Sequence, residues 1–495
     1  MSVAADTVGH MLKRRGGQAR DVEHPEAPPT LRSTSDFARW RDAMSTTDRS
    51  VSDAERIDQL RVLEELKAAA SAAQARIAVD FEASQLQVQA SAGVPTARRG
   101  RGIGAQVALA RRESPARAGR LLGLAKALVN EMPHTFAALQ TGVISEWRAT
   151  LLVRESACLT VADRAAFDAE LWADPEATER LGDSRLVARA KQIAYRLDPR
   201  SVVRRSRKAE SERCVTVRPA PDTMTYLTGL LPVAQGVGVF AALTRAADAL
   251  RAQGDPRSRA QIMADTLVER ITGQDRAADV PVEVQVVMTD RALLAGDDEP
   301  AVIPGYGTVP AEWARALIAA RTGTADATGT SAGAGHAVLV WLRRLFTAPG
   351  TGQLVAMDSR RRTVPPGLAR FLDARDQVCR TLWCEAPIRH HDHIQSHADG
   401  GATSAENLRG TCEACNYAKE APGWHTRTVP AAEQRAGPGP SGHVVETITP
   451  TGHRYTSGAP PLPGRAGALR GTAPPGTRAV PSPAERRLLD LIWAA

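Results

Sequence analysis

Residues 379–425 read CRTLWCEAPIRHHDHIQSHADGGATSAENLRGTCEACNYAKEAPGWH. This stretch contains two cysteine pairs, C-x4-C and C-x2-C, separated by 27 residues: Cys379 with Cys384, and Cys412 with Cys415. The spacing is typical of a tetrahedral site in which four thiolates hold Zn2+, with each pair on one tight turn. Because four protein ligands leave no open coordination position, the pattern predicts a structural zinc ion.

The size of this segment supports the same prediction. A segment this short cannot bury enough apolar surface to fold by itself, so a structural metal is expected. The chain has only six cysteines in 495 residues, which excludes a disulfide scaffold and makes two close pairs unusual. The remaining two, Cys158 and Cys214, stand alone in apolar surroundings and are predicted to be buried thiols.

A second set of polar groups lies around the second cysteine pair. Asp392-His393, Gly400-Gly401 and Asn407-Leu408 precede it, and Asn416 follows Cys415 directly. The two glycines suit a hairpin turn, where a positive φ is needed, and no helix with P-loop spacing follows them. An acid, an imidazole and amides enclosed by a zinc clamp indicate a small nuclease.

These motifs carry a resemblance to a known family. The segment from Arg375 to Lys419 resembles the HNH endonucleases, whose pattern is Asp-His, a Gly-Gly turn, Asn-Leu, then Cys-x2-Cys followed by His or Asn. The signature positions are here His393, Asn407 and Asn416. Over roughly residues 55–425 the chain is similar to the 13E12-repeat proteins, which join a long helical domain of unknown function (number 222) to a C-terminal HNH domain.

The resemblance implies roles for these residues. His393 would be the general base that activates water, which a neutral imidazole can do near pH 7. Composition alone does not choose among the four histidines between positions 390 and 397, which are His390, His391, His393 and His397. The resemblance selects His393 because it follows Asp392 and precedes Ile394.

The resemblance also assigns Asp392 and Asn416 to a catalytic divalent ion, and their hard oxygen atoms suit Mg2+ or Mn2+. Asn407 would orient the His393 ring or tie the β-hairpin to the helix. Two positions depart from the commonest family pattern. Asn416 replaces a final histidine, which leaves open a degenerate site, and Ser396 stands where proline is common.

Charge points to an anionic partner. The net charge is +8, the pI is about 9.5, and arginine is far commoner than lysine. We expect DNA, with backbone contacts from Arg360, Arg361 and Arg362 just before the module. Arg409 and Lys419 are further candidates for phosphate contact, although solvent exposure alone also explains them. A zinc-dependent protein that binds DNA without cutting it is the alternative function. The oligomeric state does not follow from the sequence.

The predicted fold class is α+β: a mainly α-helical N-terminal domain, a flexible linker and a C-terminal zinc-stabilised ββα-metal finger. The predicted segments are a disordered N-terminus (1–50), the helical domain (51–320), the linker (321–336), a hairpin and helix (337–375), the HNH domain (376–428), and a Pro/Gly-rich tail with a short C-terminal helix (429–495). The N-terminal residues lack the apolar core of a secretory signal, and no apolar run suits a membrane span, so we expect a cytoplasmic protein.

Hydrophobic periodicity places several elements. A long helix is expected from Ser52, with an apolar face that runs from Ile57 to Phe81. Further helices are expected near 121–132, after Ser145, and at 163–172, 184–196, 238–251 and 368–374. Strands are expected at 214–217, 223–227, 280–288 and 444–449.

Overall fold

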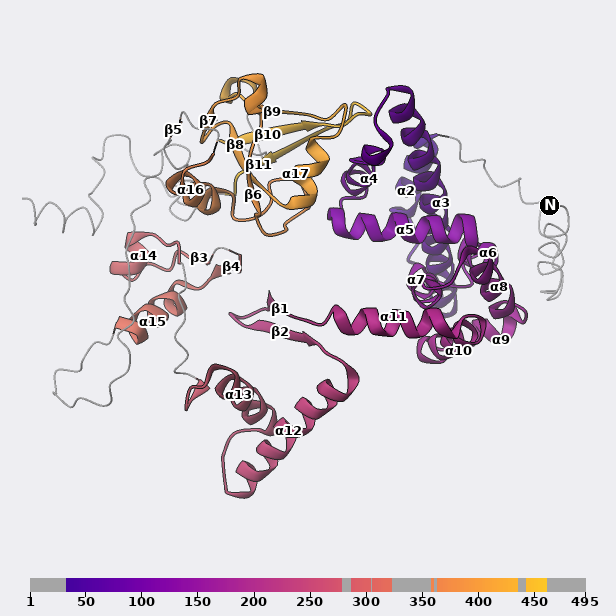
Figure 1. The fold of residues 1–495 in the computed structure, drawn as a ribbon, viewed down its shortest axis with the longest axis horizontal. Coiled ribbons are helices and arrows are strands. Elements are labelled where there is room, and N and C mark those ends of the chain that lie inside the picture. The colour runs from indigo at the N-terminus through magenta and orange to yellow at the C-terminus, as the bar shows by residue number, and fades with distance from the viewer. Residues whose placement is uncertain are drawn as a thin grey trace, which may run out of the picture. The chain divides into compact units, whose positions relative to one another are not determined.

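The computed structural model describes residues 33–277, 286–303, 305–322, 358–359, 363–434 and 442–460 (Figure 1). It divides the chain into two compact units, Met1–Glu64 and Glu65–Ala495. The described part of the first unit holds α2 (Thr34–Met44), which a capping box at Ser33 begins, and the first turns of α3 (Asp53–Ser91). Residues 1–50 were expected to lack regular structure, and α2 corrects that expectation for its own residues.

The long helix predicted from Ser52 is α3, but its expected apolar face is only partly buried. Ile57, Leu60 and Ile77 are all more than half exposed. The residues that α3 buries include the alanines Ala68, Ala72 and Ala75. Periodicity therefore located the helix correctly, whereas the close approach of neighbouring helices depends on small residues that carry a weak hydrophobic signal.

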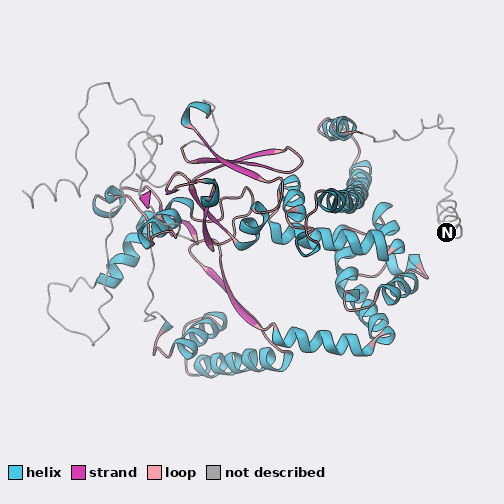
Figure 2. Cartoon of the chain, turned by 45° about the horizontal axis from the view of Figure 1, so that its top comes forward, coloured by secondary structure: helices cyan, strands magenta, loops and turns pink. Residues whose placement is uncertain are grey.

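The second unit continues with a series of helices, shown in Figure 2. They are α4 (Ile103–Arg111), α5 (Pro115–Glu131), α6 (Pro133–Gln140), α7 (Glu146–Ser156), α8 (Val161–Leu171), α9 (Pro175–Glu179), α10 (Asp183–Leu197) and α11 (Pro199–Ser211). Side-chain caps begin several of them: Ser114, Ser145 and Thr160 each accept a hydrogen bond from a backbone N–H in the first turn. The predicted helices at 121–132, after Ser145, at 163–172 and at 184–196 are confirmed, with boundaries shifted by a few residues.

The core of this helical region is built mainly from Leu and Ala. Leu128, Leu152, Phe167, Leu171 and Leu186 are almost fully buried in one cluster. Trp147, in the first turn of α7, is 58% exposed and lies outside this cluster. No helix among the described residues combines the length and apolar content needed to cross a membrane.

The middle of the chain contains a β-hairpin followed by helices. The strands predicted at 214–217 and 223–227 are present as β1 (Cys214–Pro219) and β2 (Thr225–Leu230), which pair antiparallel, and α12 (Val233–Ala252) and α13 (Arg259–Thr272) follow. Then come α14 (Asp290–Leu294), β3 (Ala301–Ile303), β4 (Gly307–Val309) and α15 (Ala311–Thr322). Most of the strand expected at 280–288 lies outside the described residues, although Val287 bridges to Val302.

The two cysteines outside the four-cysteine pattern are not buried. Cys214, in β1, is exposed, and Cys158, between α7 and α8, is half-buried, so the prediction of two buried thiols is wrong.

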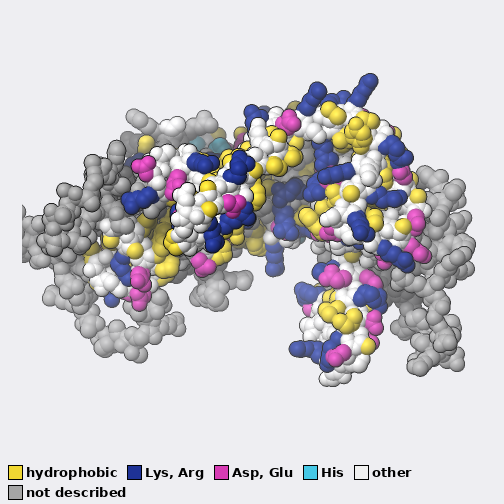
Figure 3. Space-filling view, turned by 90° about the horizontal axis from the view of Figure 1, so that it is seen from below, with side chains coloured by type: hydrophobic (Ala, Val, Ile, Leu, Met, Phe, Trp, Pro, Cys, Tyr) yellow, Lys and Arg dark blue, Asp and Glu magenta, His cyan; other side chains and the backbone are white. Residues whose placement is uncertain are grey.

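Apolar side chains are also exposed in the middle part of the chain. Val233 and Phe240 on α12 are 82% and 64% exposed. Figure 3 shows hydrophobic side chains on the face seen from below, among Lys and Arg side chains.

The C-terminal module comprises the described residues between 358 and 460. Its elements are β5 (Asp358–Ser359), α16 (Pro366–Asp376), β6 (His390–His393), η3 (His397–Asp399), β7 (Thr403–Ser404), β8 (Leu408–Thr411), α17 (Glu413–Lys419), β9 (His425–Val429), η4 (Ala431–Glu433), β10 (Val444–Ile448) and β11 (Arg454–Gly458). Strands β6 and β8 pair antiparallel, with Asp392 opposite Arg409 and His393 opposite Leu408. A separate antiparallel sheet has the order β11-β10-β9.

The region after Val429 is more structured than a Pro/Gly-rich tail. The predicted strand at 444–449 is present as β10, but it forms the centre of a three-stranded sheet. The predicted C-terminal helix, the linker at 321–336 apart from its first two residues, and the hairpin after it lie outside the described residues. The predicted helix at 368–374 is confirmed as part of α16.

A buried carboxylate joins the parts of this module. Asp376 is 0% exposed and accepts hydrogen bonds from Arg375, from Arg380 and from the backbone N–H of Gly410 in β8. Burial by itself would raise the pKa of Asp376, but the hydrogen bonds and charges of the two arginines outweigh it and the pKa is lowered.

The two arginines extend the network. Arg375 donates to the carbonyls of Ala405 and Leu408, and Arg380 donates to those of His443 and Ser457 at 2.9 Å each. In return, the Ser457 hydroxyl donates to the Arg380 carbonyl at 2.6 Å. Through Arg375 and Asp376 the network attaches α16 to β8. Through Arg380 it attaches the loop that carries Cys379 and Cys384 to His443, just before β10, and to Ser457 in β11.

We predict that Asp376→Asn destabilises the C-terminal module by about 3–5 kcal/mol, because it leaves two buried guanidinium groups without a counter-charge. Hydrogen–deuterium exchange of the peptides from 379–421 in the full chain measures this effect. Glu433→Gln is the matched control, since it removes the same charge from a half-exposed pair with Arg427 and should cost below about 1 kcal/mol. Similar exchange rates in the two variants would contradict the central place given to Asp376.

Candidate functional site

The four predicted cysteines come together. Cys379 and Cys384 lie in the loop between α16 and β6, Cys412 is the N-cap of α17, and Cys415 lies in the first turn of that helix. All four are buried, and their sulfur atoms lie within 4.8 Å of one another. The Sγ atoms of Cys384 and Cys412 are 3.6 Å apart.

This geometry fits a tetrahedral zinc ion. Zn–S bonds of about 2.3 Å place the sulfur atoms about 3.8 Å apart. Zinc binds cysteine as the thiolate, so four sulfur atoms gathered at this spacing would lose their protons when the ion binds. The backbone on either side of Cys384 is bent, with φ values of 60° at Trp383 and 51° at Glu385, both in the left-handed region. Residues other than glycine adopt such a turn at a cost that metal binding can offset.

The predicted metal ligands Asp392 and Asn416 also lie together. Asp392 is in β6, and its carboxylate faces α17. In the amide orientation that its surroundings favour, the nitrogen of Asn416 donates to both carboxylate oxygens of Asp392, at 3.3 Å each. A rotation of the Asn416 amide would direct its oxygen to the same place, so the pair can offer hard oxygen ligands to a divalent cation.

His393 is the next residue in β6, and the structure distinguishes it from its neighbours. Its Nε2 atom is 2.9 Å from the hydroxyl of Thr403 in β7, and the His397 ring stands edge-on at 5.7 Å between centroids. His391 is bound elsewhere, with Nε2 2.8 Å from a carboxylate oxygen of Asp373. The ring of His390 lies 6.4 Å from that of Tyr417.

Thr403 was missed by sequence reasoning. It is 2% exposed, so its contact fixes the orientation of the His393 ring from a buried position. A threonine soon after the Gly-Gly turn carries no distinctive sequence signal, because its relation to His393 depends on the path of the loop.

Asn407 holds this loop closed. Its side-chain oxygen accepts from the backbone N–H of Gln395, and its nitrogen donates to the carbonyls of Gln395 and Ala402, all at 2.8–3.0 Å. None of these three bonds reaches the His393 ring or α17. The observed role of Asn407 is therefore to hold together the two sides of the loop between β6 and β8.

The two glycines of this loop have separate functions. Gly400 has the positive φ expected of a turn, at 83°. Gly401 is required for space, since a Cβ atom there would lie 2.0 Å from the Gln395 carbonyl oxygen.

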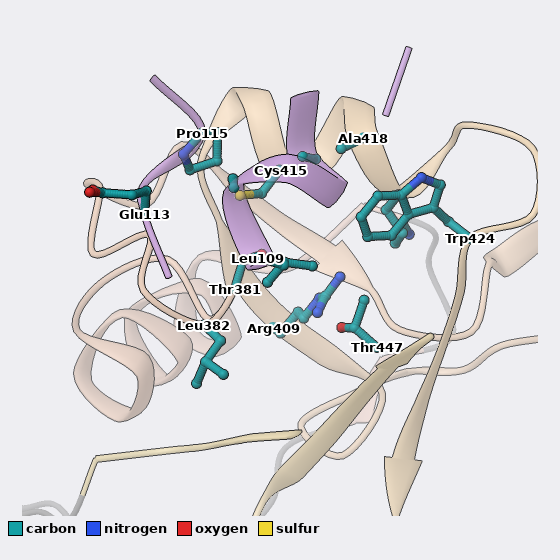
Figure 4. Close-up of a pocket in the computed structure, with 13 residues that line it drawn as sticks. Leu109, Glu113, Pro115, Thr381, Leu382, Arg409, Cys415, Ala418, Trp424 and Thr447 are labelled. Carbon is teal, nitrogen blue, oxygen red and sulfur yellow. The ribbon is translucent and has the colours of Figure 1, made fainter. Parts of the chain in front are cut away.

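The predicted DNA contacts are placed differently from expectation. Arg409 is only 2% exposed and points into a pocket whose lining includes Thr381, Leu382 and Trp424 (Figure 4). Its Nε and Nη1 atoms have no hydrogen-bond partner in the part of the chain that the structure describes. Arg409 therefore offers no surface to DNA in this structure, because its side chain turns inward from β8. Arg360, Arg361 and Arg362 lie outside the described residues.

Lys419 is likewise not a free surface cation. Its side chain is 9% exposed, and its ammonium is 2.8 Å from a carboxylate oxygen of Asp392. The expectation of a solvated lysine on the last turn of the helix is wrong, because α17 ends where its C-terminal side chain can turn back onto β6.

Comparison with known families gives two matches that follow each other along the chain. Residues 60–376 match the model of the family described as Domain of unknown function (DUF222), and residues 379–421 match that of the HNH endonuclease family. The chain matches no curated protein and no solved structure.

We predict that purified, reduced protein contains about one zinc ion per chain, and that Cys412→Ser loses it and unfolds the C-terminal module while the helical region stays folded. Metal analysis together with circular dichroism measures both effects. Cys158→Ser is the control, since that cysteine lies outside the cluster. Protein freshly prepared under reducing conditions that held no zinc would contradict the assignment of the four cysteines.

Proposed function

Because this chain belongs to the DUF222 family and carries a C-terminal HNH endonuclease domain, we propose that it is a metal-dependent endonuclease that hydrolyses phosphodiester bonds of DNA. The observation that carries the proposal is the arrangement of Asp392, Asn416 and His393 on β6 and α17, two elements joined beside a four-cysteine site. This arrangement places a carboxylate and an imidazole on one strand and an amide on the helix beside it.

We assign a catalytic Mg2+ or Mn2+ to Asp392 and Asn416, in addition to structural Zn2+ at the four cysteines. The donor atoms suit these ions, since carboxylate and amide oxygens are preferred by hard cations, whereas thiolates select zinc. When bound, such an ion would stabilise the negative charge that develops on the phosphate and on the leaving oxygen.

In this proposal His393 removes a proton from the attacking water. A neutral imidazole can accept a proton near pH 7, and Thr403 supplies an orienting contact on its Nε2 side. Asn407 is a positioning residue in this account, because its three hydrogen bonds close the loop that leads from His393 to Thr403.

DNA is the proposed partner, and the cytoplasm is the proposed location. The net charge of +8 favours a polyanion, and four reduced thiolates are maintained most readily in a reducing compartment. A protein that binds DNA without cutting it is the alternative, and the experiment below separates the two.

We predict that His393→Ala lowers the cleavage of supercoiled plasmid with Mg2+ or Mn2+ by about 10²- to 10⁴-fold, because the general base is lost. DNA affinity should stay nearly unchanged, since this imidazole contributes to the transition state and not to ground-state binding. Asp392→Ala should also remove cleavage, through loss of the metal.

His397→Ala is the matched control, since it removes a neighbouring imidazole from the loop after β6 and should retain most of the activity. Equal activity in His393→Ala and the unmodified protein would refute the proposed mechanism. Absence of cleavage by any of these proteins, with retained DNA binding, would favour the alternative function.

A further inference from the structure

Lys419 occupies an unusual position for a lysine. It is the last residue of α17, and its side chain turns back across the helix end to β6, where its ammonium lies 2.8 Å from Oδ2 of Asp392. The same ammonium donates to the carbonyl oxygen of His393 at 2.6 Å and lies 3.1 Å from a carboxylate oxygen of Glu420. One cation thus contacts both central residues of the proposed site.

The surroundings make this ion pair strong. The side chains of Lys419 and Asp392 are 9% and 15% exposed, so water screens their attraction only weakly. The pair of Lys419 with Glu420 is different, because the Glu420 side chain is 63% exposed. Asp392 is therefore the principal partner of the ammonium.

A divalent cation and the Lys419 ammonium compete for the carboxylate of Asp392. The Mg2+ or Mn2+ assigned above needs an oxygen of Asp392 as a ligand, and the ammonium already interacts with one of them. Two cations within a few ångströms repel each other, most strongly where water is scarce. Binding of the metal must therefore displace the ammonium or be weakened by it.

We propose that Lys419 is the resident counter-ion of Asp392 in the metal-free protein, and that it couples metal binding to DNA binding. The proposal rests on the proposed function, because it concerns the same site. The divalent ion takes the place of the ammonium, which then needs a new anionic partner. A DNA phosphate supplies that partner within reach of the lysine side chain.

The coupling has a definite thermodynamic consequence. Without DNA, part of the metal-binding free energy goes into breaking the Lys419–Asp392 pair, so the metal binds weakly. With DNA, the displaced ammonium gains a phosphate, so the metal binds more tightly. By linkage, the metal must raise the affinity for DNA by the same factor. The protein would then load its catalytic ion chiefly when its substrate is present.

The test measures Mn2+ affinity of the zinc-loaded full chain by electron paramagnetic resonance of free Mn2+, with and without a DNA duplex, in Ca2+-free buffer. Lys419→Gln should bind Mn2+ on the order of tenfold more tightly than the unmodified protein without DNA, because it removes the competing charge. The tightening of Mn2+ binding by DNA should shrink in the same variant.

Three variants control the result. Lys419→Arg keeps the charge and should bind Mn2+ as the unmodified protein does. Lys191→Gln removes one positive charge from an exposed position of α10 and should change nothing. Asp392→Asn should abolish the gain given by Lys419→Gln, which ties the effect to this carboxylate. Zinc content checks that each variant is folded.

Equal or weaker Mn2+ binding by Lys419→Gln would overturn the proposal, as would a complete absence of Mn2+ binding in both proteins. The outcome is distinct from that of the proposed function, because affinity is measured without cleavage. Tighter binding by Lys419→Gln in a protein that cuts no DNA would support this inference while contradicting the nuclease activity.

Discussion

The charge of Asp376 is buried at the centre of the C-terminal module, and the parts of the module depend on how it is neutralised. Its carboxylate holds Arg375 and Arg380, which bind the carbonyls of Ala405, Leu408, His443 and Ser457. It also accepts from the backbone N–H of Gly410, in the strand that pairs with the one carrying Asp392 and His393. A small module with little apolar core thus gains rigidity from fully buried charged hydrogen bonds, in addition to its cysteine cluster.

This network shows where the module ends. The match to the HNH family stops at residue 421, yet Arg380 reaches His443 and Ser457 well beyond it. The sheet of β9, β10 and β11 is therefore part of the structure that positions the first cysteine turn. Rigid support of this kind matters for chemistry, because catalytic groups must be held within a fraction of an ångström of productive positions.

Sequence reasoning located most elements and the four cysteines, because periodicity and cysteine spacing are local signals. It also brought Asp392 and Asn416 together correctly, through the family pattern. It missed Thr403 and did not foresee the burial of Arg409 and Lys419, whose positions depend on long-range packing. An arginine on a short strand gives no sign of turning inward, and a lysine at a helix end gives no sign of reaching a carboxylate 27 residues earlier. The burial of Asp376 could not be predicted from the sequence either, since an Arg-Asp pair at a helix end is common on protein surfaces.

The central claim is that this chain hydrolyses DNA with a divalent metal, and isotope incorporation tests it most directly. Zinc-loaded full-length protein would be incubated with DNA and Mg2+ or Mn2+ in water enriched in oxygen-18, and the cleaved ends analysed by mass spectrometry. Hydrolysis by activated water predicts one oxygen-18 atom in the single new terminal phosphate at each cut, a free hydroxyl on the other new end, and no cleavage when the metal is chelated. Intact DNA with every divalent ion, or products whose terminal phosphate lacks solvent oxygen, would contradict the account.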